Sequence, residues 1–119
     1  ETLLFAAKAA QALKARLTVL HVCDYPIYAD RDPLKGPKQL LADFIGRLPA
    51  HLRRACRPES EVAFGKPAAE IVAAADRFDL VVLAAHRKGL LENALLGTTA
   101  ERVLRHCRKP VLAVPVKNG

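Results

Sequence analysis

The chain has 119 residues, of which 51% are hydrophobic and 26% are charged, and its formal net charge is +7. This length and composition are typical of one globular domain that builds its core without disulfides or metal, so we expect a single domain over residues 1–119. No run of about 20 uncharged apolar residues is present, and charged residues interrupt the first apolar segment. We therefore expect no membrane partner and no secretory signal.

The three cysteines are Cys23, Cys56 and Cys107, an odd number at wide spacing with no C-x-x-C pair. This usage is typical of buried or free thiols in a reducing compartment, so we expect a cytoplasmic protein. No two of the four histidines stand at metal-ligand spacing, and no metal site is predicted.

Basic residues are spread along the chain, and no aromatic residues alternate with them as a nucleic-acid stacking platform would require. We interpret them as a solvated basic face and expect no nucleic-acid partner. The densest groups are Arg53, Arg54 and Arg57, then Arg87 and Lys88, then Arg102, Arg105, Arg108 and Lys109.

The N-terminal half predicts a helix, a buried strand, a long loop and an amphipathic helix, over residues 1–14, 15–22, 23–38 and 38–56. High helix propensity and regular apolar spacing support the two helices, and a run rich in β-branched residues supports the strand. Pro49 is expected to kink the second helix or to end its first part. The apolar residues expected to face inward are Leu3, Ala6, Ala10 and Leu13 in the first helix, and Leu40, Leu41, Phe44, Ile45, Leu48 and Leu52 in the second.

The C-terminal half predicts a strand over 60–65, a helix over 66–78, a strand over 79–85, a helix over 97–107 and a last strand over 109–116. Pro67 suits a first helical turn, and the prolines of the last strand suit an edge position. Glu101 and Arg105 are expected to pair on the outer face. The inward residues expected are Ile71, Val72 and Ala75, then Ala100, Val103, Leu104 and Cys107.

This alternation of helices and strands predicts a doubly wound parallel sheet with helices on both faces. Such a fold normally opens with a strand, whereas this sequence opens with a helix. We therefore expect a further first strand that this sequence lacks. Ligands of open parallel sheets bind at the carboxyl ends of the strands, which here are residues 22–24, Gly65 and residues 84–88.

The start of the helix at Gly97 is the junction with the clearest binding chemistry. A helix start offers free backbone N–H groups and the positive end of the dipole, and glycine allows a ligand to approach the backbone closely. The hydroxyls of Thr98 and Thr99 either cap the helix or bind a phosphate oxygen. The alternative is that Gly97–Thr98 is only a turn and a helix cap.

Residues 80–116, from "LVVLAAHRKG" to "KPVLAVPV", resemble the C-terminal half of the universal stress protein family. The stretches "FGKPAAEIVAAADRFDLVVL" and "ARLTVLHV" resemble preceding segments of the same family. The resemblance spans the whole chain. It implies an α/β fold, namely a Rossmann-like (adenine nucleotide alpha hydrolase-like) doubly wound parallel five-stranded sheet whose first strand is absent here.

Nucleotide-binding members of the family carry a motif that resembles G-x-x-G, nine residues, then G-[ST]. Gly97–Thr98 matches its end, whereas Ala84 and Arg87 stand at the earlier glycine positions. Arg87 either offers a charged fork to a phosphate or fills the pocket. By correspondence with the family, the site for ATP, or for AMP or ADP, with or without Mg²⁺, is Val22, Leu83, Ala84, Arg87, Gly97, Thr98 and Thr99.

The resemblance implies a stress-response regulator that binds an adenine nucleotide and acts through dimer or partner contacts. The alternative is a non-nucleotide member that acts as a dimeric interaction module with a degenerate pocket. In both cases we expect a homodimer through the edge strand Val111–Val116. Further protein partners are not identified by the sequence. No carboxylate pair, Ser-His-Asp order or G-K-[ST] loop supports an efficient hydrolase, so at most a slow ATPase is expected.

Overall fold

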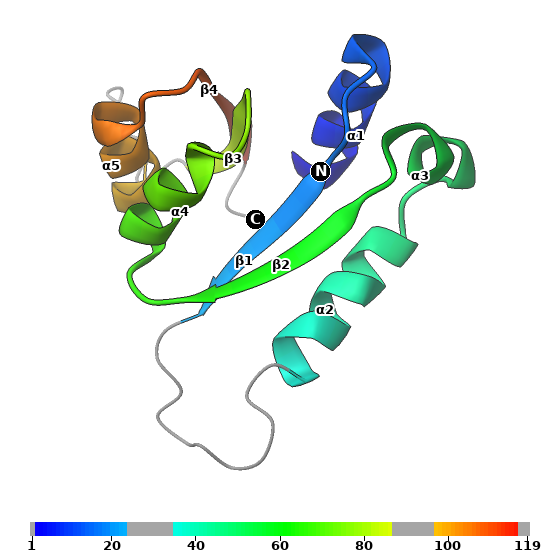
Figure 1. Cartoon of the computed structure of the whole chain (residues 1–119), viewed down its shortest axis with the longest axis horizontal. Coiled ribbons are helices and arrows are strands. Elements are labelled where there is room, and N and C mark those ends of the chain that lie inside the picture. The colour runs from blue at the N-terminus through cyan, green and yellow to red at the C-terminus, as the bar shows by residue number, and fades with distance from the viewer. Residues whose placement is uncertain (1, 24–34, 87–96, 117–119) are drawn as a thin grey trace. The chain divides into compact units, whose positions relative to one another are not determined.

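A computed structural model of the chain describes residues 2–23, 35–86 and 97–116 (Figure 1). None of the helices in these ranges is long and apolar enough to cross a bilayer. In chain order the elements are α1 (Thr2–Leu13), β1 (Thr18–Cys23), α2 (Lys35–Gly46), α3 (Ala50–Cys56), β2 (Glu59–Phe64), α4 (Pro67–Ala75), β3 (Val81–His86), α5 (Thr98–His106) and β4 (Val111–Val116).

The strands pair in parallel, which confirms the predicted α/β class. β1 pairs with β2 from Thr18↔Glu59 to Cys23↔Phe64. β3 pairs with β4 from Val81↔Val111 to His86↔Val116. The contacts divide the chain into two compact units, which we describe separately: the first unit is Leu3–Lys66, and the second unit is Pro67–Gly119 together with residues 1–2.

Small side chains of α1 and larger ones of α3 form the core of the first unit. Ala7, Leu52 and Cys56 are buried almost completely, and Ala10 and Leu48 complete the cluster. The small alanine side chains of α1 leave space that the apolar side chains of α3 fill. α2 packs instead along β1 and β2 (Figure 1).

In the first half of residues 38–56, the predicted inward face is wrong for Leu40 and Phe44 and confirmed for Leu41. Leu40 and Phe44 are 48% and 46% exposed, whereas Leu41 is 5% exposed. The prediction extended one apolar stripe through Pro49. The structure ends α2 at Gly46 and begins α3 at Ala50, with Pro49 as the residue before α3. Because α2 and α3 are separate helices, the apolar residues that face inward on α3 do not continue the apolar stripe of α2.

The other inward faces are partly as predicted. Ala6 and Ala10 are buried, but Leu13, at the end of α1, is 66% exposed. In the second unit Ala75, Ala100 and Val103 are buried, whereas Leu104 is 41% exposed. α4 and α5 pack against each other there, and α5 also contacts both strands (Figure 1).

Candidate functional site at the amino end of α5

The direction of α5 follows from its connection to β4. α5 ends at His106, and only four residues separate it from Val111 at the start of β4. The backbone N–H of Val81 donates to the carbonyl of Pro110 at 2.9 Å, which holds the start of β3 at the same place. Since α5 packs along both strands, its amino end points toward their carboxyl ends. This is the end at which parallel sheets bind ligands.

Gly97 caps the amino end of α5 with an extended backbone, φ −57° and ψ 157°. Its carbonyl accepts the Glu101 N–H at 3.0 Å. The first amides of a helix have no partner inside the helix, and the dipole places positive charge there. The φ of Gly97 is accessible to every residue type, so this glycine contributes the absence of a Cβ rather than an unusual conformation. Thr98 and Thr99 follow it in the first turn, and both are exposed.

Leu83 and Ala84 lie on β3, opposite Ala113 and Val114 of β4. Successive side chains of a strand point to opposite faces. Leu83 and Ala84 therefore cannot both present their side chains to one ligand, and one of them would contribute its backbone. Ala84 stands at the first glycine position of the family motif. Its φ is not positive, because the described non-glycine residues with positive φ are Lys14 and Arg57.

The two remaining predicted residues are Val22 and Arg87. Val22 lies on β1, opposite Ala63, and so belongs to the first unit. Arg87 lies outside the described residues. The structure thus brings Gly97, Thr98 and Thr99 together in one helix start, with Leu83 and Ala84 on a strand of the same unit.

Gly65 is a conformational requirement that motif reasoning did not identify. It is buried, has φ 145°, and donates its N–H to the Cys23 carbonyl at 2.9 Å. That bond closes the carboxyl end of the β1–β2 pair just before α4 starts at Pro67. A glycine between a strand and a Pro-initiated helix was the available sequence signal.

Among the described residues, the first turn of α5 carries one carboxylate, that of Glu101. Glu101 binds Arg105 at 2.9 Å, and this pairing offsets the negative charge of the carboxylate.

The three cysteines are all free thiols. Burial raises the pKa of Cys56, whose Sγ donates to the Leu52 carbonyl at 3.0 Å, so this thiol stays neutral in the core.

Two parallel strand pairs joined by helical crossovers, with a glycine-capped helix start toward the carboxyl ends of β3 and β4, define a Rossmann-like α/β protein. A family model described as the universal stress protein family matches residues 1–115. The chain belongs to the universal stress protein family.

Solved structures support this assignment. A protein of the universal stress protein family from Burkholderia pseudomallei is 25% identical, with a TM-score of 0.67 over 97% of this chain and 85% of that chain. The universal stress protein UspA from Lactobacillus plantarum is 25% identical, with a TM-score of 0.60 over 95% of this chain and 86% of that chain. The hypothetical protein MJ0577 is 27% identical, with a TM-score of 0.60 over 100% of this chain and 91% of that chain. A search of curated proteins finds no match.

Proposed function

We propose that this universal stress protein binds ATP or a related adenine nucleotide at the amino end of α5 and acts in the cytoplasm as a stress-response regulator. The observation that supports this proposal most directly is the helix start at Gly97, where Thr98 and Thr99 are exposed. Unpartnered amides, a positive dipole end and two hydroxyls are the groups that bind phosphate oxygens. Mg²⁺, where present, would arrive with the nucleotide phosphates.

Two substitutions at the family glycine positions bear on this proposal. Ala84 adds one methyl group to a strand residue whose φ is not positive, so it creates no backbone strain. Arg87 adds a guanidinium, which forms bidentate bonds with phosphate. Both substitutions are compatible with phosphate binding through side chains and helix amides rather than through a glycine loop.

Calorimetric titration of ATP with Mg²⁺ tests the site through Thr98→Glu. A carboxylate in the first turn stabilises a helix, so this variant should fold at least as well as wild type, while repelling phosphate. We expect ATP affinity to fall by more than about tenfold, since a like charge is placed beside the bound anion. Arg87→Ala should also weaken binding if the guanidinium contacts phosphate.

Arg108→Gln is the matched control, because it changes the net charge by the same one unit from an exposed position beyond the carboxyl end of α5. Its ATP affinity should stay within about twofold of wild type, since exposed charges act weakly at a distance. No binding by wild type, or equal weakening by Thr98→Glu and Arg108→Gln, would contradict the proposed nucleotide site.

A second candidate function is a dimeric interaction module without nucleotide. The exposed edge strand β4 favours it: β3 is its only strand partner among the described residues, and Leu112 is 39% exposed. Unprotected apolar edges promote association, so burial in a homodimer through Val111–Val116 is physically sensible. Binding by Arg87→Gly but not by wild type would favour this candidate, with Arg87 as the group that fills the pocket.

A further inference from the structure

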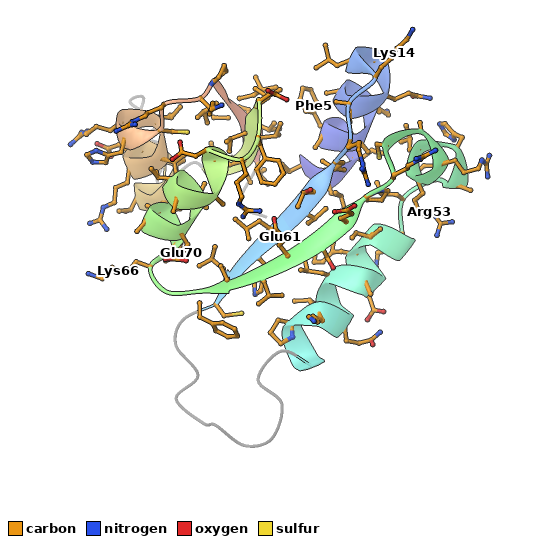
Figure 2. All side chains as sticks on the ribbon, in the orientation of Figure 1. Phe5, Lys14, Arg53, Glu61, Lys66 and Glu70 are labelled. Carbon is orange, nitrogen blue, oxygen red and sulfur yellow. The ribbon has the colours of Figure 1, made fainter. Side chains whose placement is uncertain are left out.

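The amino ends of β1 and β2 carry a concentrated set of exposed basic side chains. We call this surface the basic end. It lies opposite the carboxyl ends of β1 and β2, because it is formed by the segments that precede each strand. Figure 2 shows two of its residues, Lys14 beyond α1 and Arg53 on α3. The exposed residues of the basic end are Lys14, Arg16, Arg53, Arg54 and Arg57.

Backbone hydrogen bonds hold the two segments of the basic end together. The N–H of Leu17 donates to the Cys56 carbonyl at 3.0 Å, and the N–H of Glu59 donates to the Leu17 carbonyl at 2.9 Å. Strand pairing continues directly from there, with Thr18 opposite Glu59. Basic residues that are distant in sequence are therefore brought to the same end of the β1–β2 pair.

Two of these cations stand where a helix end favours glycine. Lys14 has φ 55°, and the bonds from Ala15 N to Ala10 O (2.8 Å) and from Lys14 N to Gln11 O (3.2 Å) form a Schellman motif. Arg57 has φ 44° at the end of α3, and its N–H donates to the Arg53 carbonyl at 3.0 Å. Left-handed backbone is costly for residues with a Cβ. Both helices thus keep a charged side chain where glycine would relieve strain.

The chemistry of the basic end fits carboxylates. Glu59 is the one acidic residue within its segments, 14–17 and 50–59. It binds Arg16 at 2.6 Å, so the surface already holds one carboxylate on a guanidinium. The helix ends here are C-terminal and carry partial negative charge, which disfavours a small anion against the backbone. An anion must therefore meet the tips of the long side chains.

We propose that the basic end is a docking surface for an acidic segment of a partner protein, bound through its carboxylates. Four of the five cations are arginines, whose planar forks bind carboxylates in bidentate geometry. Phosphates of nucleic acid are bound typically by basic residues together with helix amino ends and stacking aromatics. Segments 14–17 and 50–59 contain no Phe, Tyr or Trp, and the helix ends next to Lys14 and Arg57 are the carboxyl ends of α1 and α3. This docking does not depend on nucleotide binding at α5.

The test uses Lys14→Gly/Arg57→Gly in the full chain, with a fluorescent peptide of ten glutamates as the probe. Glycine relieves the left-handed backbone, so the double variant should unfold at a higher temperature than wild type. It also removes two cations, so its peptide affinity should fall by about three- to tenfold at low salt. A purely structural role for these residues would not couple higher stability to weaker binding.

Arg102→Gln/Arg108→Gln is the matched control, since it removes two exposed charges from the second unit. Its peptide affinity should stay within about twofold of wild type. The proposal is overturned by an absence of peptide binding, by equal weakening in both double variants, or by unchanged binding in Lys14→Gly/Arg57→Gly. Tighter binding of a DNA duplex than of the peptide, lost in that same variant, would assign the surface to nucleic acid instead.

Discussion

Among the described residues, positive φ occurs at Lys14, Arg57 and Gly65. The two basic residues carry strain at helix ends, whereas Gly65 avoids it at the end of β2. Gly97 has an ordinary φ, although it was the glycine that the sequence motif singled out. A glycine in a sequence motif therefore does not always need a positive φ, and a glycine outside the motif can need one. The backbone φ distinguishes the two cases.

Gly65→Ala is expected to lower the free energy of unfolding by about 1–3 kcal/mol, because φ 145° is a region that residues with a Cβ rarely adopt. Urea denaturation measures the change. Gly46→Ala is the control: an added Cβ there meets no atom within 4 Å, and alanine favours the helix. It should leave stability unchanged or raise it by up to about 1 kcal/mol. Equal effects of the two substitutions would contradict the account of Gly65.

At the scale of elements, the break between α2 and α3 decides which apolar residues are buried. Proline fixes its own φ and cannot donate to the preceding turn, so the helix stops before Pro49 and restarts after it. Leu52 then enters the core beside Ala7 and Ala10, while Leu40 faces outward. A stripe that looks continuous in sequence is therefore two stripes in space.

Leu52→Ala is expected to destabilise the protein by about 2–5 kcal/mol, because the side chain is 1% exposed and its removal leaves a cavity. Leu40→Ala removes the same atoms from a side chain that is 48% exposed. Its cost should be below about 1 kcal/mol. Denaturant midpoints of the two variants compare the positions directly, and similar losses would mean that Leu40 is buried in solution.

At the scale of the whole molecule, the proposed functions use different residues. The nucleotide site lies toward the carboxyl ends of β3 and β4, and the basic end lies at the amino ends of β1 and β2. The proposed dimer uses β4. Since these surfaces share no residue, substitutions can disrupt each of them separately.

Leu112→Lys should convert a β4-mediated dimer into a monomer, because it places a charge on the exposed face of the pairing strand, where Leu112 is 39% exposed. Light scattering at micromolar concentration measures the mass. Leu104→Lys, at 41% exposure on α5, is the matched control and should leave the mass unchanged. A wild-type monomer, or dissociation by both variants, would refute pairing through β4.

Local chemistry made much of this protein readable from its sequence. Periodicity located the helices and strands of the described residues to within a few positions, except that α2 and α3 were expected as one helix with a kink or an end at Pro49. The Glu101–Arg105 pair followed from spacing on one helix face and is confirmed at 2.9 Å. The start of α5 at Gly97–Thr98 was equally predictable, because cap chemistry is local.

Other features depended on contacts between segments distant in sequence, and only the tertiary structure decided them. Leu41 rather than Leu40 is buried because α2 packs on β1 and β2. Gly65 has a positive φ where its N–H bonds Cys23 on the neighbouring strand and the chain turns from β2 toward α4. The basic end exists because Leu17 and Cys56 bond across the fold. Spacing along the chain encodes local geometry, whereas burial, register and the grouping of charges arise when separate elements meet.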